Sequence, residues 1–257
     1  MATSLSAVTQ PVALVTGASR GIGRSVAQFL AQRGVRVAVH FQRNEVAAQE
    51  TLLSLEGEGH AVFAADVADG AQCEDLIKRV LQHFGVLDVL VNNAGIYEDH
   101  DIKASSYPEW RRLWQRTMEA NLSGPANLTY LAVQHMRPRG TGRIINVSSR
   151  GAFRGEPMAP AYGAAKAGLN SFGQSMARAL APDGITFFTV APGWIATDMA
   201  QPSLTGPKAQ EVLDQHPLGR VGTPDEIAEV VAWLALEAPA NLTGCIIDAN
   251  GASYLRT

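Results

Sequence analysis

Cysteine, charge of one sign and long apolar runs are all scarce in this 257-residue sequence. The two cysteines, Cys73 and Cys245, lack C-x-x-C spacing, which argues against a disulfide framework or a thiolate metal site. The 21 basic residues nearly balance the 24 acidic ones, so the formal charge of −3 does not suggest a nucleic-acid-binding or polybasic membrane protein. The longest apolar runs fall short of the ~20 residues needed to span a membrane.

Hydrophobic residues make up 46% of the chain and charged residues 18%, as in ordinary globular proteins. This composition and length predict a single domain over residues 11–257. Residues 1–10 contain no basic segment and no long apolar run, so we expect a disordered leader and not a signal peptide. Together these features predict a cytoplasmic protein that binds small molecules and copies of itself, with no metal, nucleic-acid or membrane partner.

Apolar, β-branched runs alternate with stretches of helical spacing along the chain. The runs do not alternate polar with apolar residues, which is typical of parallel strands covered on both faces. Seven strands are predicted, at Pro11–Thr16, Val35–Phe41, Ala61–Ala65, Leu87–Val91, Arg143–Val147, Ile185–Val190 and Cys245–Asp248. Helices are predicted at Gly23–Arg33, Glu45–Leu55, Ala71–Phe84, Pro108–Met136, Tyr162–Leu180 and Pro224–Leu236. The order predicts an α/β fold: one doubly wound, Rossmann-type domain with a seven-stranded parallel sheet.

Two further segments have a distinct local pattern. Residues 194–217 form the least regular stretch and contain three prolines, so they are predicted to be a mobile cover over a site. Thr223-Pro224-Asp225-Glu226 predicts a helix start, with Thr223 at the N-cap and acidic residues in the first turn.

A glycine-rich segment, Thr16-Gly17-Ala18-Ser19-Arg20-Gly21-Ile22-Gly23, links the first predicted strand to the first helix. Glycines let the backbone turn sharply and approach a pyrophosphate, whose charge is favoured by the helix N-terminus. The spacing is G-x-x-x-G-x-G and not the general dinucleotide pattern G-x-G-x-x-G. A simple strand-to-helix turn without a ligand is the alternative.

The end of the second predicted strand bears on cofactor choice. An acidic residue there would bond a ribose 2′-hydroxyl and repel a 2′-phosphate. No acidic residue precedes Glu45 in this region, whereas Arg43 and Arg20 could pair with a 2′-phosphate. The sequence therefore predicts NADP(H). In the alternative interpretation Arg43 is a solvated surface residue and Arg20 belongs only to the helix start, which leaves the choice undecided.

Polar motifs gather where the predicted strands end. Tyr162 and Lys166 are four residues apart, so the phenol and the ammonium lie on one face of a helix. A phenol with a pKa near 10 needs a nearby cation to favour its phenolate form, and Lys166 supplies one. Asn92–Gly95 follows the fourth strand, Ser148-Ser149 the fifth and Pro192-Gly193 the sixth, at the edge where doubly wound sheets bind ligands.

Asn121 lies in one of the predicted helices. Together with the motifs above, in this order along the chain, it makes the sequence resemble the short-chain dehydrogenase/reductase family from Val12 to Tyr254. The resemblance implies a catalytic tetrad of Asn121, Ser149, Tyr162 and Lys166; Ser149 is preferred to Ser148 because it stands thirteen residues before Tyr162. It also implies a cofactor site made of Thr16, Gly17, Ser19, Arg20, Gly21, Ile22, Gly23, Arg43, Asp66, Val67, Asn93, Ala94, Gly95, Tyr162, Lys166, Pro192, Gly193, Ile195 and Thr197. Two alternatives stay open: Asn121 bonding a backbone carbonyl, and Asp66 capping a loop.

The resemblance further implies a mechanism for reducing a carbonyl compound. Tyr162 would give a proton to the carbonyl oxygen while NADPH supplies a hydride. Ser149 would hold that oxygen, Lys166 would bind the nicotinamide ribose and lower the pKa of Tyr162, and Asn121 would hold a water that returns protons.

Within the family, the chain is most similar to the 3-oxoacyl-[acyl-carrier-protein] reductase branch of fatty acid biosynthesis, which implies an acyl-thioester substrate and a homotetramer. Trp194 and Asp183 depart from the pattern of that branch. The substrate could therefore be another ketone, a sugar, a steroid or a quinone, and the enzyme could work in the alcohol-oxidising direction. Phe153, Met158, Trp194 and Met199 are predicted to line an apolar pocket. A regulator that senses NADP and has no catalytic activity is a further alternative. Loss of Tyr162, Lys166 or Ser149 would favour it, and all three residues are present.

Overall fold

The computed structural model describes residues 10–207 and 209–256, so residues 1–9 of the predicted leader lie outside the described part. One sheet runs in the order β3-β2-β1-β4-β5-β6-β7, and every neighbouring pair is parallel. Its strands are β1 (Val12–Val15), β2 (Arg36–Phe41), β3 (Ala61–Ala64), β4 (Val89–Asn92), β5 (Gly142–Val147), β6 (Ile185–Pro192) and β7 (Ile246–Ala249). The predicted seven-stranded Rossmann-type sheet is confirmed.

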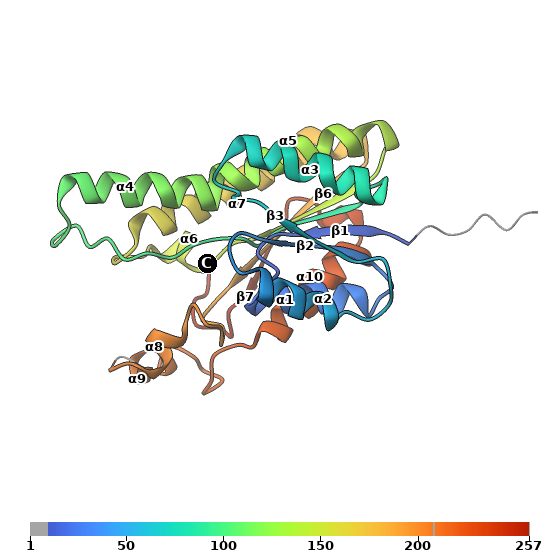
Figure 1. The fold of residues 1–257 in the computed structure, drawn as a ribbon. Helices are drawn as coiled ribbons and strands as arrows, with labels where there is room; N and C mark the ends of the chain where they lie inside the picture. Colours follow the sequence, from blue (N-terminus) through green and yellow to red (C-terminus); the bar gives the residue numbers. More distant parts are fainter. Residues whose placement is uncertain (1–9, 208, 257) are drawn as a thin grey trace, which may run out of the picture.

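Helices cover both faces of this sheet, as Figure 1 shows. One face carries α1 (Gly21–Ala31), α2 (Glu45–Leu53) and α10 (Pro224–Leu236); the other carries α3 (Gly70–Phe84), α5 (Gly124–Met136) and α7 (Pro160–Leu180), with α4 (Tyr107–Met118) beyond the sheet. The chain order reverses between β1 and β4, where connections leave in opposite directions. Ligands of open α/β sheets bind at such a switch point, outside the carboxyl ends of the strands.

Two apolar clusters fill the space between the sheet and its helices. In β1, Leu14 packs in the cluster under α3 and α5, while its neighbour Val15 packs in the cluster under α1 and α10. Ile144 and Ile145 of β5 divide in the same way. Successive strand residues point to opposite faces, so an unbroken apolar run is required when both faces are covered.

The helix predicted over residues 108–136 is interrupted, which corrects the sequence analysis. α4 ends at Met118, a π-helical turn spans Glu119–Ser123, and α5 begins at Gly124. Pro125 has no backbone N–H to donate to the preceding turn. Gly124 also packs so closely that a Cβ there would overlap the Val67 carbonyl oxygen. These two residues favour a wider turn over a continuous α-helix.

The predicted cover contains short helices and is therefore more regular than expected. They are α8 (Gln201–Thr205) and α9 (Ala209–Leu213), and they lie to one side of the layers in Figure 1. The base of this segment is closed by an isolated bridge between Ile195 and Gly222, with the Gly222 N–H donating to the Trp194 carbonyl at 3.0 Å. We call residues 194–217 the lid segment.

The predicted start of α10 is confirmed in detail. The Thr223 side chain accepts from the Glu226 N–H, and the Glu226 carboxylate accepts from the Thr223 N–H, which forms a capping box. α7 begins two residues before the predicted start, at Pro160. Over the described ranges, no helix is both long and apolar enough to cross a bilayer.

Candidate active site

The glycine-rich segment turns tightly between β1 and α1. Gly17 and Gly21 have φ angles of 64° and 53°, in the left-handed region that favours glycine. A Cβ at Gly23 would overlap the Gly17 carbonyl oxygen and press on the Asn93 amide. Bare backbone therefore faces the end of the sheet at the N-terminus of α1, an arrangement that fits the pyrophosphate of a dinucleotide.

Thr16 joins the loops that follow β1 and β4. Its hydroxyl donates to the Val91 carbonyl at 3.1 Å and accepts from the N–H groups of Asn93 and Ala94, both at 2.9 Å. The Asn93 amide donates in return to the Thr16 carbonyl at 2.8 Å. Thr16 is buried and does not line the cavity described below, so its role in this structure is to hold the glycine-rich segment against the loop after β4.

His40 is a residue of this region that the sequence analysis missed. It lies in β2 and is fully buried, with Nδ1 accepting from the Gly17 N–H at 3.0 Å and Nε2 donating to the Ala65 carbonyl at 3.1 Å. Burial lowers the pKa of His40 from 6.5 to about 4, so the ring is neutral. A polar residue within an apolar strand covered on both faces was the available signal, because such a residue needs buried partners.

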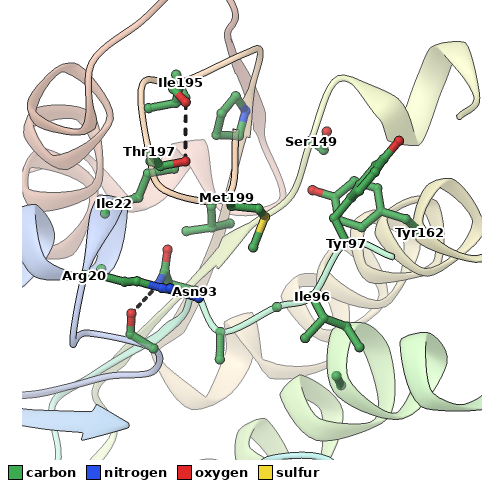
Figure 2. Close-up of a pocket in the computed structure, with 18 of the residues that line it drawn as sticks. Arg20, Ile22, Asn93, Ile96, Tyr97, Ser149, Tyr162, Ile195, Thr197 and Met199 are labelled. Atoms are coloured by element: carbon green, nitrogen blue, oxygen red, sulfur yellow. Dashed lines mark hydrogen bonds between the residues drawn. The ribbon is translucent and has the colours of Figure 1, made fainter. Parts of the chain in front are cut away.

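One cavity of about 810 Å³ brings the predicted site residues together along the carboxyl edge of the sheet. Its walls include every predicted cofactor residue except Thr16, and Ser149, Tyr162 and Lys166 of the tetrad. Figure 2 shows Arg20, Ile22, Ile195 and Thr197 on one side of this space and Tyr97, Ser149 and Tyr162 on the other. The cavity is therefore long enough to place a nucleotide and a second small molecule side by side.

Arg43 and Arg20 lie at the β2 end of the cavity, and both side chains are exposed. An Arg20 nitrogen stands 3.9 Å from the Asp198 carboxylate of the lid segment. The Asp66 carboxylate also lines this end, where it accepts from the Ala68 N–H at 3.0 Å. Asp66 thus caps its own turn, which is the loop-cap interpretation. Its position on the cavity wall is also compatible with the cofactor contact that the resemblance implies.

The tetrad residues come from three elements. Tyr162 and Lys166 lie one turn apart on α7, with the Lys166 Nζ 5.7 Å from the centre of the Tyr162 ring and donating to the Val147 carbonyl at 2.8 Å. Ser149 follows β5 and accepts from the Gly151 N–H at 3.0 Å. The Ser148 hydroxyl donates instead to the Lys166 carbonyl at 3.4 Å.

Burial governs the pKa values of Tyr162 and Lys166. Burial raises the pKa of Tyr162 to about 12, with the Glu156 carboxylate adding to the rise and the Ser149 hydroxyl opposing it. Burial also lowers the pKa of Lys166 to about 8. Tyr162 is therefore a protonated phenol at neutral pH, as a general acid requires. The expected lowering of its pKa by Lys166 stays a prediction.

Asn121 lies in the π-helical turn and is completely buried, but it does not line the cavity. Its Oδ1 accepts from the Ile96 N–H and its Nδ2 donates to the Ile96 carbonyl, both at 2.8 Å. This is the backbone-bonding alternative, and it fixes the segment that follows β4. The expected role of Asn121 in a water relay stays a prediction.

The substrate end of the cavity has a different lining from the one expected. Trp194 and Met199 line it, whereas Phe153 and Met158 do not; Phe153 instead packs under the Arg256 guanidinium at 4.3 Å. The residues of this wall that the sequence analysis did not single out as site residues include Tyr97, Arg150 and Glu156. The Tyr97 ring meets the Tyr162 ring edge-on, with the ring centres 5.1 Å apart.

Comparison with known proteins gives the same family as the sequence motifs. A family model described as "Enoyl-(Acyl carrier protein) reductase" matches residues 17–251. The chain is 40% identical over 245 residues to 3-oxoacyl-[acyl-carrier-protein] reductase FabG of Staphylococcus aureus, covering 95% of this chain and 98% of that protein. For the protein of the same name from Vibrio cholerae the identity is 40%, with 95% and 97% covered, and for 3-oxoacyl-[acyl-carrier-protein] reductase of Synechocystis it is 38%, with 96% and 98% covered.

These relatives are oxidoreductases that share nearly the full length of the chain, and the cavity holds three of the four residues that the resemblance implies as a tetrad. The chain is therefore an enzyme that belongs to the short-chain dehydrogenase/reductase family.

Proposed function

We propose that this enzyme uses NADPH to reduce the 3-oxo group of an acyl thioester to a hydroxyl. The observation that carries the proposal is the single cavity that has a glycine cradle and two arginines at one end and Ser149, Tyr162 and Lys166 at the other. The printed activity of the relatives, 3-oxoacyl-[acyl-carrier-protein] reductase, supplies the substrate class.

The cofactor choice rests on the charges at the β2 end. Arg43 and Arg20 line the cavity there, and no acidic residue lies between β2 and Glu45. A guanidinium can bind a 2′-phosphate through paired charge-assisted hydrogen bonds. The bare backbone at Gly17 and Gly23 would hold the pyrophosphate.

When bound, NADPH supplies the hydride that the carbonyl carbon accepts. Tyr162 donates its phenolic proton to the carbonyl oxygen, and its pKa of about 12 keeps that proton available at neutral pH. Ser149 donates a hydrogen bond to the same oxygen and holds it beside the phenol. Lys166, buried next to the Tyr162 ring, stabilises the phenolate left after the transfer.

The assembly we propose is a homotetramer, as the family resemblance implies. α4 supports it, because Tyr107 and Trp114 are exposed on this helix and Trp110 stacks on Trp114 with the ring centres 5.9 Å apart. Exposed aromatic side chains that gather on one helix are typical of interaction surfaces.

The test follows nicotinamide absorbance with NADPH and, separately, NADH, while acetoacetyl-coenzyme A and a panel of ketones, aldehydes and quinones are supplied. Rapid NADPH oxidation with acetoacetyl-coenzyme A is expected. A strong preference for a carbonyl outside the 3-oxoacyl class contradicts the substrate proposal, and a higher kcat/KM with NADH contradicts the cofactor proposal.

A further inference from the structure

A carboxylate faces the substrate end of the cavity, and the proposed mechanism does not use it. Glu156 lies between α6 (Gly151–Arg154) and α7, and its side chain is 13% exposed. It lines the same wall as Tyr97 and Tyr162; burial raises the pKa of both phenols, and the Glu156 carboxylate adds to the rise. A nearly buried carboxylate is costly unless something binds it, so its partners decide what it does.

Two glycines fix the place of Glu156. A Cβ at Gly151 would lie 2.5 Å from the Glu156 Oε1, and a Cβ at Gly163 would lie 3.8 Å from the Glu156 Cβ. The carboxylate is close enough to Tyr162 to interact with it electrostatically. Its ionic partner is Arg154, with Nε 3.5 Å from Oε1, which is longer than a good charge-assisted hydrogen bond.

The neighbouring arginines point at the lid segment. Arg150 donates to the Gln215 Oε1 at 2.7 Å and to the Ser253 carbonyl at 3.3 Å, and Arg154 donates to the same Gln215 oxygen at 3.2 Å. Both guanidinium groups therefore have oxygen partners outside the reaction space. Among the described residues Glu156 has only the long contact with Arg154, so its carboxylate can still accept a hydrogen bond from a bound molecule.

The local charge restricts what Glu156 can bind. Arg154 contacts the carboxylate and Arg150 interacts with it electrostatically, so an ammonium group would meet net repulsion from the two guanidinium groups. An anionic group has no proton to donate to the carboxylate. A neutral hydrogen-bond donor meets neither penalty, and a bond to a charged acceptor is stronger than one between neutral groups.

We infer that Glu156 is a specificity-determining residue that accepts a hydrogen bond from a neutral donor, a hydroxyl or an amide N–H, which the substrate carries near its reacting carbonyl. The inference rests on the proposed function and narrows its substrate class. An amide N–H would come from a pantetheine-like thioester arm, and a hydroxyl from a hydroxylated ketone.

Two matched pairs of ketones test it and separate these sources. The amide pair is the acetoacetyl thioester of N-acetylcysteamine against that of butanethiol, and the hydroxyl pair is ethyl 4-hydroxyacetoacetate against ethyl acetoacetate. We expect the wild-type kcat/KM to favour the donor-bearing member of one pair by about tenfold, which is ~1.4 kcal/mol. In Glu156→Leu this ratio should fall to about one, and in Glu156→Gln, which keeps a neutral acceptor, to an intermediate value.

Glu58→Gln is the matched control, because it removes a carboxylate from the exposed surface outside the cavity wall. The ratio should be the same in this variant as in the wild type. An unchanged ratio in Glu156→Leu, even with slower turnover of both ketones, would mean a structural role and overturn the inference. No preference in either pair overturns it and leaves the reductase proposal standing, whereas a wild-type enzyme that reduces none of the four ketones overturns both.

Discussion

The proposed reaction requires the hydroxyl of Tyr162 as its general acid. Tyr162→Phe should lower kcat by about 1,000-fold or more, because a positioned general acid contributes ~10²–10⁴ in rate. Binding of NADPH, followed by fluorescence titration, should change by less than about twofold, since the hydroxyl acts on the transition state. Tyr130→Phe, at an exposed position on α5, is the control. More than a tenth of wild-type turnover in Tyr162→Phe would rule out this acid.

Arg43 carries the cofactor prediction. Arg43→Glu should lower kcat/KM for NADPH by about 10–100-fold, because it removes one charge-assisted contact and adds repulsion of the 2′-phosphate. The value for NADH should change by less than about threefold. Arg33→Glu makes the same change of charge at an exposed position on the surface next to α1. Equal losses with the two nucleotides would show that Arg43 does not discriminate between them.

Among single residues, the sequence predicted those whose side-chain type and spacing along the chain already indicate a chemical role. Tyr162, Lys166 and Ser149 could be named in advance, and the cavity brings them together. His40 and Glu156 could not, because their importance comes from partners distant in the chain or from a turn whose path the sequence does not reveal. The rise in the pKa of Tyr162 could not be predicted either, because it comes from burial, which depends on the tertiary structure.

His40 connects three elements, since it lies in β2 and bonds the loop after β1 and the end of β3. Its pKa is about 4 in the folded protein against 6.5 for the free group, so the unfolded state binds a proton more readily. The free energy of unfolding should therefore hold above about pH 6.5 and fall by about 3 kcal/mol as the pH drops to about 4.

Urea unfolding across this range, compared between the wild type and His40→Asn, measures that fall. The variant should be less stable at neutral pH, because Asn cannot reach both partners, but its stability should depend less on pH. The same pH dependence in both proteins would contradict a buried neutral His40.

The seven strands were predicted because an apolar, β-branched run is a strong local signal. The helix over residues 108–136 was wrongly predicted as continuous, since the close approach of Gly124 to Val67 is a tertiary contact. α6, α8 and α9 were not predicted either. Helices of four or five residues have too little local stability to leave a clear pattern and depend on their surroundings.

Assembly is the property of the whole molecule that the fold makes testable. Light scattering should give about four times the chain mass of 27.3 kDa. Trp114→Glu should lower the mass to that of a dimer or monomer, because a charge would replace an aromatic side chain that is 37% exposed on α4. Leu53→Glu, at the end of α2 on the opposite face of the sheet, should leave the mass unchanged. A wild-type monomer would contradict the tetramer.

The π-helical turn at Glu119–Ser123 also constrains how the gene can change in length. A π-helical turn holds one residue more than an α-helical turn, so a one-codon deletion there could restore a continuous α-helix with little rotation of α5 relative to α4. A one-codon change within α4 or α5 would instead rotate part of the helix by about 100° relative to the rest. α4 packs on α7 while α5 packs on α3 and β4, so no single rotation would keep both sets of neighbours. Insertions and deletions should therefore be purged from α4 and α5 during divergence, whereas loss of the one extra residue in the π-helical turn keeps both sets of neighbours in place.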